Sequence, residues 1–223
     1  MIMCLMANCL TASAATTYTV PVTVKYGQTE ARSMLNMINK FRTGKDAWYW
    51  DYGDKEKIYL TDLSKLEYDY GLEQIAMQRA AEIAVSFSHT RPNGSSCFDI
   101  AVSSGASSYG ENIAAGYGSA ASVFEGWQET NYGYSGQGHR RNMLGGYTHV
   151  GIGHVVVNGI HYWVQEFGYG SGAAKTSAND SNTTVNIGID SSMISSLSVT
   201  PSSESMKISV GKTAKIPTAK VSF

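Results

Sequence analysis

The sequence predicts an α+β fold in which helices pack on a small antiparallel sheet. Three segments carry apolar residues at helical spacing: 30–42, 72–87 and 119–129. Two later segments, 148–157 and 160–168, alternate as strands do and are joined by Asn158-Gly159, a strong two-residue hairpin turn. Helices followed by a terminal antiparallel hairpin indicate layers of helix and sheet.

The first third of the chain predicts one extended segment, one helix and one irregular segment. Residues 15–29 are expected to form an extended lead-in, because β-branched residues alternate there. The helix over 30–42 has apolar residues at helical spacing: Met34, Leu35, Ile38 and Phe41. Thr43-Gly44 ends this helix. Residues 45–61 are aromatic and charged, and we expect a loop.

The helix over 72–87 has the clearest pattern of the chain. One face is an apolar stripe of Leu72, Ile75, Ala76, Ala80, Ile83, Ala84 and Phe87. The opposite face carries Gln74, Gln78 and Glu82. Residues 91–105 are rich in Gly, Ser and Asn and predict a loop. Ser119 or Ser122 can cap the third helix, and residues 140–144 predict one more helical turn.

Both ends of the chain differ in composition from its middle. Residues 1–14 are apolar and end in Ala12-Ser13-Ala14, the cleavage signal of a secretory signal peptide. The first basic residue is Lys25, so a positive start is missing and the signal is expected to be truncated. Residues 171–196 are rich in Ser, Thr, Asn and Ala and predict a linker. Residues 197–223 are expected to be a partial immunoglobulin-like repeat or a disordered tail.

Composition and motifs exclude several classes of function. The formal net charge of −1 over 223 residues argues against a nucleic acid partner. After the N-terminus no apolar run is long enough for a transmembrane segment. The chain has no G-x-S-x-G nucleophile motif, no P-loop and no glycine-rich nucleotide motif, so a serine hydrolase is not supported.

Two histidines and a glutamate are the candidate functional residues. His89 and His139 lie in loop-like sequence rich in Gly, Ser and Arg. Glu111 follows Gly110 in an expected turn, where glycine lets a carboxylate point into a cleft. Two imidazoles and a carboxylate are the minimum protein set for an open Zn²⁺ site with water in the fourth position. The alternative is that each histidine is a structural group that bonds the backbone.

Other reactive side chains have plainer interpretations. Glu129 is a second candidate carboxylate, or a solvated residue at a helix end. Arg91, Arg140 and Arg141 can pair with these carboxylates and hold them ionised. Cys97 would be the lone thiol after signal removal, and a buried or loop thiol is favoured over a catalytic one because no basic residue adjoins it. Packing or solvent-facing roles are expected for the hairpin histidines His149, His154 and His161.

Six motifs occur in a characteristic order. They are FSHTRPNG at 87–94, GENI at 110–113, Trp127, GHRRNML at 138–144, YTHVGIG at 147–153 and YWVQEFG at 162–168. In this order they resemble bacterial members of the CAP superfamily, which covers cysteine-rich secretory proteins, insect antigen 5 and plant pathogenesis-related proteins. The resemblance runs from about 30 to 170. It implies secretion and a three-layer α-β-α sandwich with a central antiparallel sheet, here followed by a Ser/Thr-rich C-terminal tail.

The resemblance also implies a set of cleft residues. In eukaryotic relatives two histidines and two glutamates line a cleft that can bind a divalent metal. By motif, His89 and His139 match the histidines and Glu111 matches the first glutamate. The second glutamate normally lies three residues after the tryptophan, where this chain has Thr130. Glu129 stands one residue earlier, and a helix turns about 100° per residue, so its direction is left open.

The disulfides of the eukaryotic relatives are absent from this chain. The cleft is expected to have further lining residues. The lining residues are Ser88, Arg91, Asn112 and Arg140.

The function expected first is that of a secreted or cell-surface binding module. Its cleft would hold Zn²⁺ or another divalent cation and meet an unknown extracellular ligand or surface. The first alternative is a metal-dependent hydrolase, a protease or esterase with Glu111 or Glu129 as general base. The second alternative is lipid or sterol binding in an apolar groove lined by Tyr109, Ile113 and Tyr117.

Overall fold

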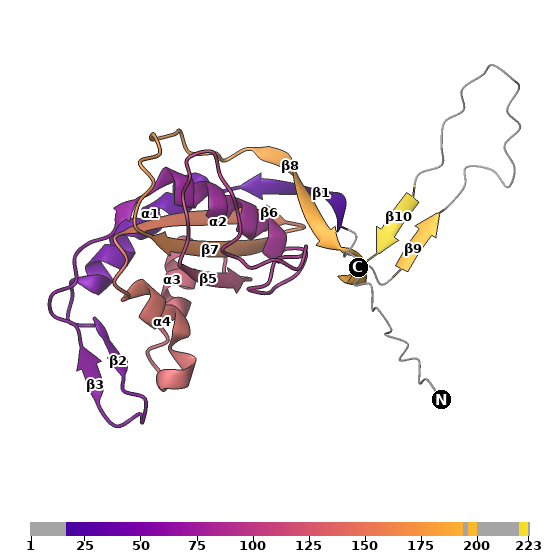
Figure 1. Ribbon diagram of the computed structural model, residues 1–223. Helices are drawn as coiled ribbons and strands as arrows, with labels where there is room; N and C mark the ends of the chain where they lie inside the picture. Colours follow the sequence, from indigo (N-terminus) through magenta and orange to yellow (C-terminus); the bar gives the residue numbers. More distant parts are fainter. Residues whose placement is uncertain (1–16, 194–195, 200–218, 223) are drawn as a thin grey trace, which may run out of the picture.

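A six-stranded sheet forms the centre of the molecule (Figure 1). The computed structural model describes residues 17–193, 196–199 and 219–222. The strands of the sheet are β1 (Thr17–Tyr26), β4 (Glu67–Tyr68), β5 (Gly110–Ala115), β6 (His149–Val157), β7 (Ile160–Gly168) and β8 (Asn182–Asp190). Their order is β5-β7-β6-β1-β8, and β4 pairs with the first two residues of β6, His149 and Val150. All pairings are antiparallel except the short β4–β6 pairing.

Helices cover both faces of this sheet and give the expected α-β-α sandwich (Figure 1). The helices are α1 (Gln28–Arg42), α2 (Tyr70–Ile83), α3 (Ala120–Gln128) and α4 (Gly138–Met143). The core clusters place α2 on one face and the other three on the opposite face. Short elements outside the sandwich are β2 (Trp48–Trp50), β3 (Lys57–Tyr59), η1 (Tyr134–Gly136), η2 (Ser191–Met193), β9 (Ser196–Val199) and β10 (Ala219–Ser222).

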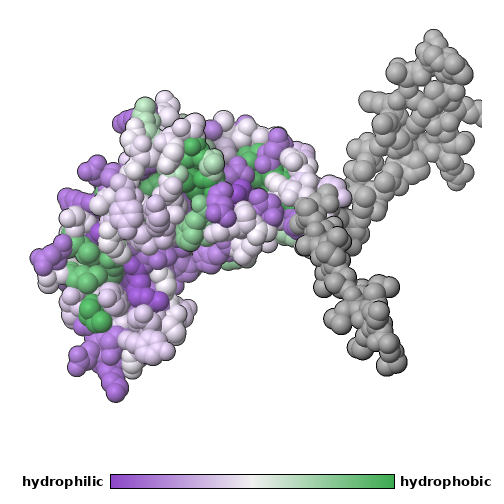
Figure 2. Space-filling model, in the orientation of Figure 1, coloured by the Kyte–Doolittle hydropathy of each residue, from purple (hydrophilic) through white to green (hydrophobic). Residues whose placement is uncertain are grey.

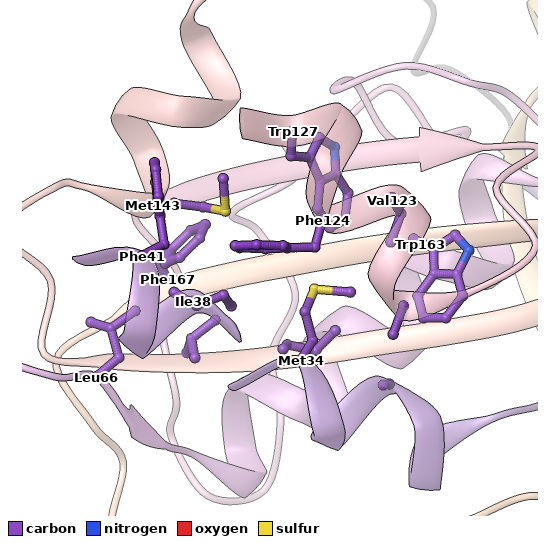
Figure 3. Packing of buried hydrophobic residues seen from close by; sticks show 14 of the residues in the cluster. Met34, Ile38, Phe41, Leu66, Val123, Phe124, Trp127, Met143, Trp163 and Phe167 are labelled. Atoms are coloured by element: carbon purple, nitrogen blue, oxygen red, sulfur yellow. The ribbon is translucent and has the colours of Figure 1, made fainter. Parts of the chain in front are cut away.

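The larger core lies between the sheet and the α1–α3 layer (Figure 3). Met34 and Ile38 of α1 meet Val123 and Trp127 of α3 above the sheet. Trp163 and Phe167 of β7 lie four residues apart on the same face of the strand, close this core from the sheet side and are fully buried. The alternation expected of the 160–168 strand is therefore confirmed, since Val164 packs on the opposite face with α2.

Two glycines of β6 set how closely α2 approaches the sheet. A Cβ added at Gly151 would lie 2.1 Å from the backbone nitrogen of Glu73. A Cβ added at Gly153 would lie 2.2 Å from the carbonyl oxygen of Ala76. No real side chain fits at these distances, so the backbone of α2 rests directly on the backbone of β6.

Several expectations about the elements are corrected. The extended lead-in is a strand, β1, of the main sheet, and the segment expected to be a loop over 45–61 contains the β2–β3 hairpin. The prediction of a linker is wrong for residues 182–190, which form β8 and pair with β1 over nine residues. The helix expected over 72–87 ends at Ile83. The side chain of Glu82, placed on the face opposite the apolar stripe, is buried.

Other expectations fall partly outside the described residues. The signal peptide over 1–14 and most of the segment over 197–223 lie outside them. The part of that segment that the structure describes contains residues of β9 and β10.

Polar residues cover most of the face seen in Figure 2, and apolar residues appear there in small, separate patches. None of the helices in the described ranges combines the length and the apolar composition needed to cross a bilayer.

Replacing Gly153 by alanine tests the close contact of α2 with β6. The added methyl group must push the helix away from the sheet, and we expect a loss of about 2 kcal/mol or more in the free energy of unfolding. Thermal denaturation should show a fall in melting temperature of roughly 5 °C or more. Gly146→Ala is the matched control, because an added Cβ there meets nothing within 4 Å. Equal melting temperatures for the two variants would contradict the packing described.

His154 predicts a specific loss of stability in mild acid. Its ring stacks on Trp163 at 3.6 Å, and its Nε2 lies 2.9 Å from Nδ1 of His161. Burial lowers the pKa of His154 to about 4. Below pH 6.5 the unfolded chain therefore binds a proton that the folded chain does not, and stability falls as the pH drops from 6.5 toward 4.

Chemical denaturation at several pH values checks this expectation. The wild-type free energy of unfolding should fall between pH 6.5 and 4.5, and the fall should be smaller in His154→Gln. His149→Gln, on a partly exposed histidine, is the control and should follow the wild type. The idea fails if His154→Gln loses stability as steeply as the wild type.

Candidate functional site

His89 forms the first half of the site and is held by a carboxylate. It lies in the loop that follows α2, six residues beyond Ile83. Its Nδ1 lies 2.7 Å from Oε1 of Glu111, while 59% of its side chain is exposed. The carboxylate accepts this hydrogen bond, so the proton is on Nδ1 and the lone pair is on Nε2.

Glu111 is buried on an edge strand, not placed in a turn as the sequence suggested. It is the second residue of β5 and faces α2. Arg79 of α2 binds it through Nε, 2.6 Å from Oε2, and through Nη2, 3.3 Å from Oε1. Burial alone would raise the pKa of Glu111, but the hydrogen bonds from His89 and Arg79 outweigh it and hold the pKa below its usual value.

Arg79 is the residue that sequence reasoning missed. It is fully buried, and its Nη1 binds Glu82 at 3.0 Å. Arg91, expected to pair with a cleft carboxylate, binds Glu82 instead, with Nη2 2.8 Å from Oε1. One signal was present: Arg79 interrupts the apolar stripe of the 72–87 segment between Ala76 and Ala80, and a charge in such a position must be paired.

Two further groups surround Glu111 on its buried side. Glu166 of β7 pairs in register with Glu111 and is fully buried. Burial, together with the charge of Glu111, raises the pKa of Glu166 well above its usual value, because both disfavour the ionised form. Ser108 donates to its Oε2 at 2.5 Å. Burial and the same carboxylates raise the pKa of the Cys97 thiol to about 12, which supports the expectation that this thiol is not catalytic.

His139 and Glu129 form the second half of the site. Nδ1 of His139, the second residue of α4, lies 2.5 Å from Oε1 of Glu129. Oε2 of Glu129 accepts the backbone N–H of Arg140 at 3.2 Å. The two halves therefore have the same arrangement, an imidazole whose Nδ1 is bound by a glutamate.

The direction of Glu129 follows from a break in the helix. α3 ends at Gln128, and Glu129 is its C-cap in the left-handed conformation, with φ 48° and ψ 38°. The helical rotation of about 100° per residue does not apply to a residue in this conformation. The side chain turns back toward α4, and Glu129 takes the part that the sequence pattern assigned to the next position, Thr130.

Asn112 and Arg140 support the cleft rather than line it. Asn112 is buried and donates to the carbonyl of His139 at 3.1 Å, and it accepts from Asn142 at 2.8 Å. Arg140 is buried, and its guanidinium binds backbone carbonyls, including that of Gln128 at 2.6 Å. It does not pair with a carboxylate through its side chain. Both residues tie α4 to neighbouring elements and so fix the place of His139.

The two halves face one open cleft with a polar and an aromatic end. The polar end, about 400 Å³, contains both histidine–glutamate pairs together with Arg141 and Asn142. The aromatic end, about 710 Å³, is lined by side chains that include Phe87, Ile113, Tyr117, Trp127 and Tyr132. Its walls share His89, Glu129 and His139 with the polar end, so the two ends are continuous.

The expected lining set is therefore only partly right. Ser88 lines the aromatic end, but Arg91, Asn112 and Arg140 line neither end. Of the groove proposed for lipids, Ile113 and Tyr117 line the cleft. The ring of Tyr109 instead lies beside that of Tyr169, tilted by 55°, with 5.3 Å between the ring centroids.

The donor atoms of the site bear on the expected metal ion. Across residues 17–193, 196–199 and 219–222, no three His, Cys, Asp or Glu side chains gather closely enough to hold an ion. The four cleft residues are thus not four direct ligands in this structure. Each glutamate contacts Nδ1 of its histidine, which leaves the two Nε2 atoms as the nitrogen donors that the cleft presents.

The layered fold and the paired imidazoles define a class of cleft-bearing α-β-α domain, and comparison with known families identifies it. The sequence profile of CAP, the cysteine-rich secretory protein family, matches residues 35–167. This match covers more than half of the chain, and the chain belongs to that family. Among curated proteins, none matches the chain.

Two solved structures are similar to the chain. One is an extracellular protein containing an SCP domain from Bacillus anthracis, with 21% identity over 63% of this chain and a TM-score of 0.42. This chain spans 40% of the length of that protein. The other is venom allergen-like protein 4 of Schistosoma mansoni, with 15% identity over 67% of this chain and 95% of that one, and a TM-score of 0.42.

Proposed function

We propose that this chain is a secreted or cell-surface binding module whose cleft holds a divalent cation between two imidazoles. One observation carries the proposal: His89 and His139 face the same cleft, and each is bound at Nδ1 by a glutamate. A carboxylate on one ring nitrogen is the usual support of a histidine that binds zinc through the other.

The donor set fits an open site rather than a closed structural one. A structural zinc site uses four protein ligands, whereas the cleft offers two nitrogens from His89 and His139. Water or an incoming ligand would complete the coordination. Such an ion can exchange with solvent, and its affinity for the protein depends on each imidazole. This arrangement suits a binding module whose ligand coordinates the metal.

The aromatic end of the cleft supports a ligand that is partly apolar. Phe87 and Tyr132 are 56% and 62% exposed there, and Trp127 forms part of the wall. Exposed rings beside a polar end suit a molecule with an apolar body and one polar or metal-binding group. The lipid or sterol alternative keeps this support, with Phe87 and Tyr132 in place of Tyr109.

The hydrolase alternative has less support from the geometry. It would use Glu111 or Glu129 as a base toward a metal-bound water. Glu111 already accepts hydrogen bonds from Arg79 and His89, and Glu129 from His139 and the Arg140 backbone. Each carboxylate would have to give up one of these bonds to take a proton.

Zinc titration by calorimetry tests the metal site. We expect the wild type to bind one ion, and His89→Ala with His139→Ala to weaken binding at least about tenfold, because both nitrogen donors are lost. His149→Ala is the matched control, since this histidine lies beside Glu67 and away from the cleft. Zinc binding that is unchanged in the double variant, or equally weakened in the control, would show that the site is elsewhere.

A further inference from the structure

We propose that Arg79 is the positioning residue of the His89 half of the cleft. It contacts the carboxylate that binds the His89 ring and the carbonyl of the preceding residue, Ser88, and through them it sets the place of the ring and the nitrogen that carries the proton. The inference rests on the proposed function in one respect, that Nε2 of His89 is the atom offered to a ligand.

The first step is the set of contacts that Arg79 makes. His89 is held through its Nδ1, which binds Oε1 of Glu111, and through the peptide that joins it to Ser88. Nε of Arg79 binds Glu111, and its Nη2 binds the Ser88 carbonyl at 2.7 Å. A single planar guanidinium therefore binds both the carboxylate that holds the ring and the peptide carbonyl on the N-terminal side of the histidine.

The second step is the rigidity of this support. The Arg79 side chain has no exposed surface, and that of Glu111 is 1% exposed. Glu82, 2% exposed, holds the third nitrogen, Nη1, at 3.0 Å. All three nitrogens of the guanidinium thus bind fixed acceptors. The exposed His89 ring is therefore attached to a buried ion-pair network.

The third step concerns the tautomer of His89. A neutral imidazole in water favours the proton on Nε2, which removes the lone pair needed for a metal ion. Glu111 reverses this preference because it accepts a hydrogen bond from Nδ1. Arg79 holds this carboxylate in the position from which it reaches the ring, through its bonds to both carboxylate oxygens.

The two halves of the cleft should therefore respond differently to a change at Arg79. Glu129 depends on its own left-handed backbone and on the N–H of Arg140, and no contact with Arg79 holds it. A lysine at position 79 keeps the charge but cannot bind Glu111, Glu82 and the Ser88 carbonyl at once. Arg79→Lys should disturb His89 and leave His139 as it is.

Arg91→Lys is the matched control. Arg91 binds Glu82, as Arg79 does, and its remaining contacts go to Ser95 and Asp99. It touches neither Glu111 nor the Ser88 carbonyl. A general loosening of the ion-pair network would affect both variants, whereas the positioning role belongs to Arg79 alone.

The experiment is ¹⁵N NMR of the imidazole nitrogens in the metal-free protein at pH 8. In the wild type and in Arg91→Lys we expect His89 with the proton on Nδ1. In Arg79→Lys we expect a shift toward the Nε2-protonated form, with the His139 signals unchanged. Zinc affinity should fall roughly tenfold in Arg79→Lys, as is typical when the support of a ligand is lost.

Two results would overturn the proposal. One is a wild-type His89 that carries its proton on Nε2, which can be seen even if Arg79→Lys does not fold. The other is a folded Arg79→Lys whose His89 signals match the wild type. Failure of the wild type to bind zinc would instead contradict the proposed function, because the tautomer is measured without metal.

Discussion

The fold depends on the close approach of α2 to the central sheet at Gly151 and Gly153. Because neither residue has a side chain, the helix backbone rests on β6 and not on a layer of side chains. This short separation lets a buried side chain of α2, Arg79, reach across to Glu111 on the edge strand β5. The site is therefore a consequence of how the helix packs, and a bulkier residue at either glycine would move Arg79 away from its partner.

The two halves of the cleft reach the same geometry by different means. Around His89, a buried arginine joins three acceptors and leaves only the imidazole in contact with solvent. Around His139, a left-handed residue at the end of α3 turns a glutamate toward α4. In both, the carboxylate binds Nδ1 and leaves Nε2 as the ring nitrogen without that contact. This shared arrangement supports our proposal that the cleft binds a cation or a polar group of a ligand. The aromatic rings of the cleft would contact the apolar part of that ligand.

Much of this could be predicted from residue patterns, and the exceptions have physical causes. Periodic apolar residues predicted the three long helices and the hairpin, because those elements bury one face. β8 escaped prediction because its Thr- and Asn-rich sequence resembles a linker, and only pairing with β1 makes it a strand. The burial of Glu82 was not predicted because helical spacing does not reveal its ion pairs with Arg79 and Arg91.

The candidate site could likewise be predicted only in part from the sequence. The residues His89, Glu111 and His139 could be named from motifs, but Arg79, the buried partner of Glu111, was missed. The direction of Glu129 depends on one backbone conformation that composition does not reveal.

A crystal structure of the protein soaked with zinc tests the central claim most directly. The account predicts one ion in the cleft, with Nε2 of His89 and Nε2 of His139 both about 2.0–2.1 Å away. Glu111 and Glu129 should remain on Nδ1 of their histidines, and Arg79 should remain on Glu111. An ion bound through the carboxylates with the imidazoles turned away, or an ion bound outside the cleft, would contradict the account.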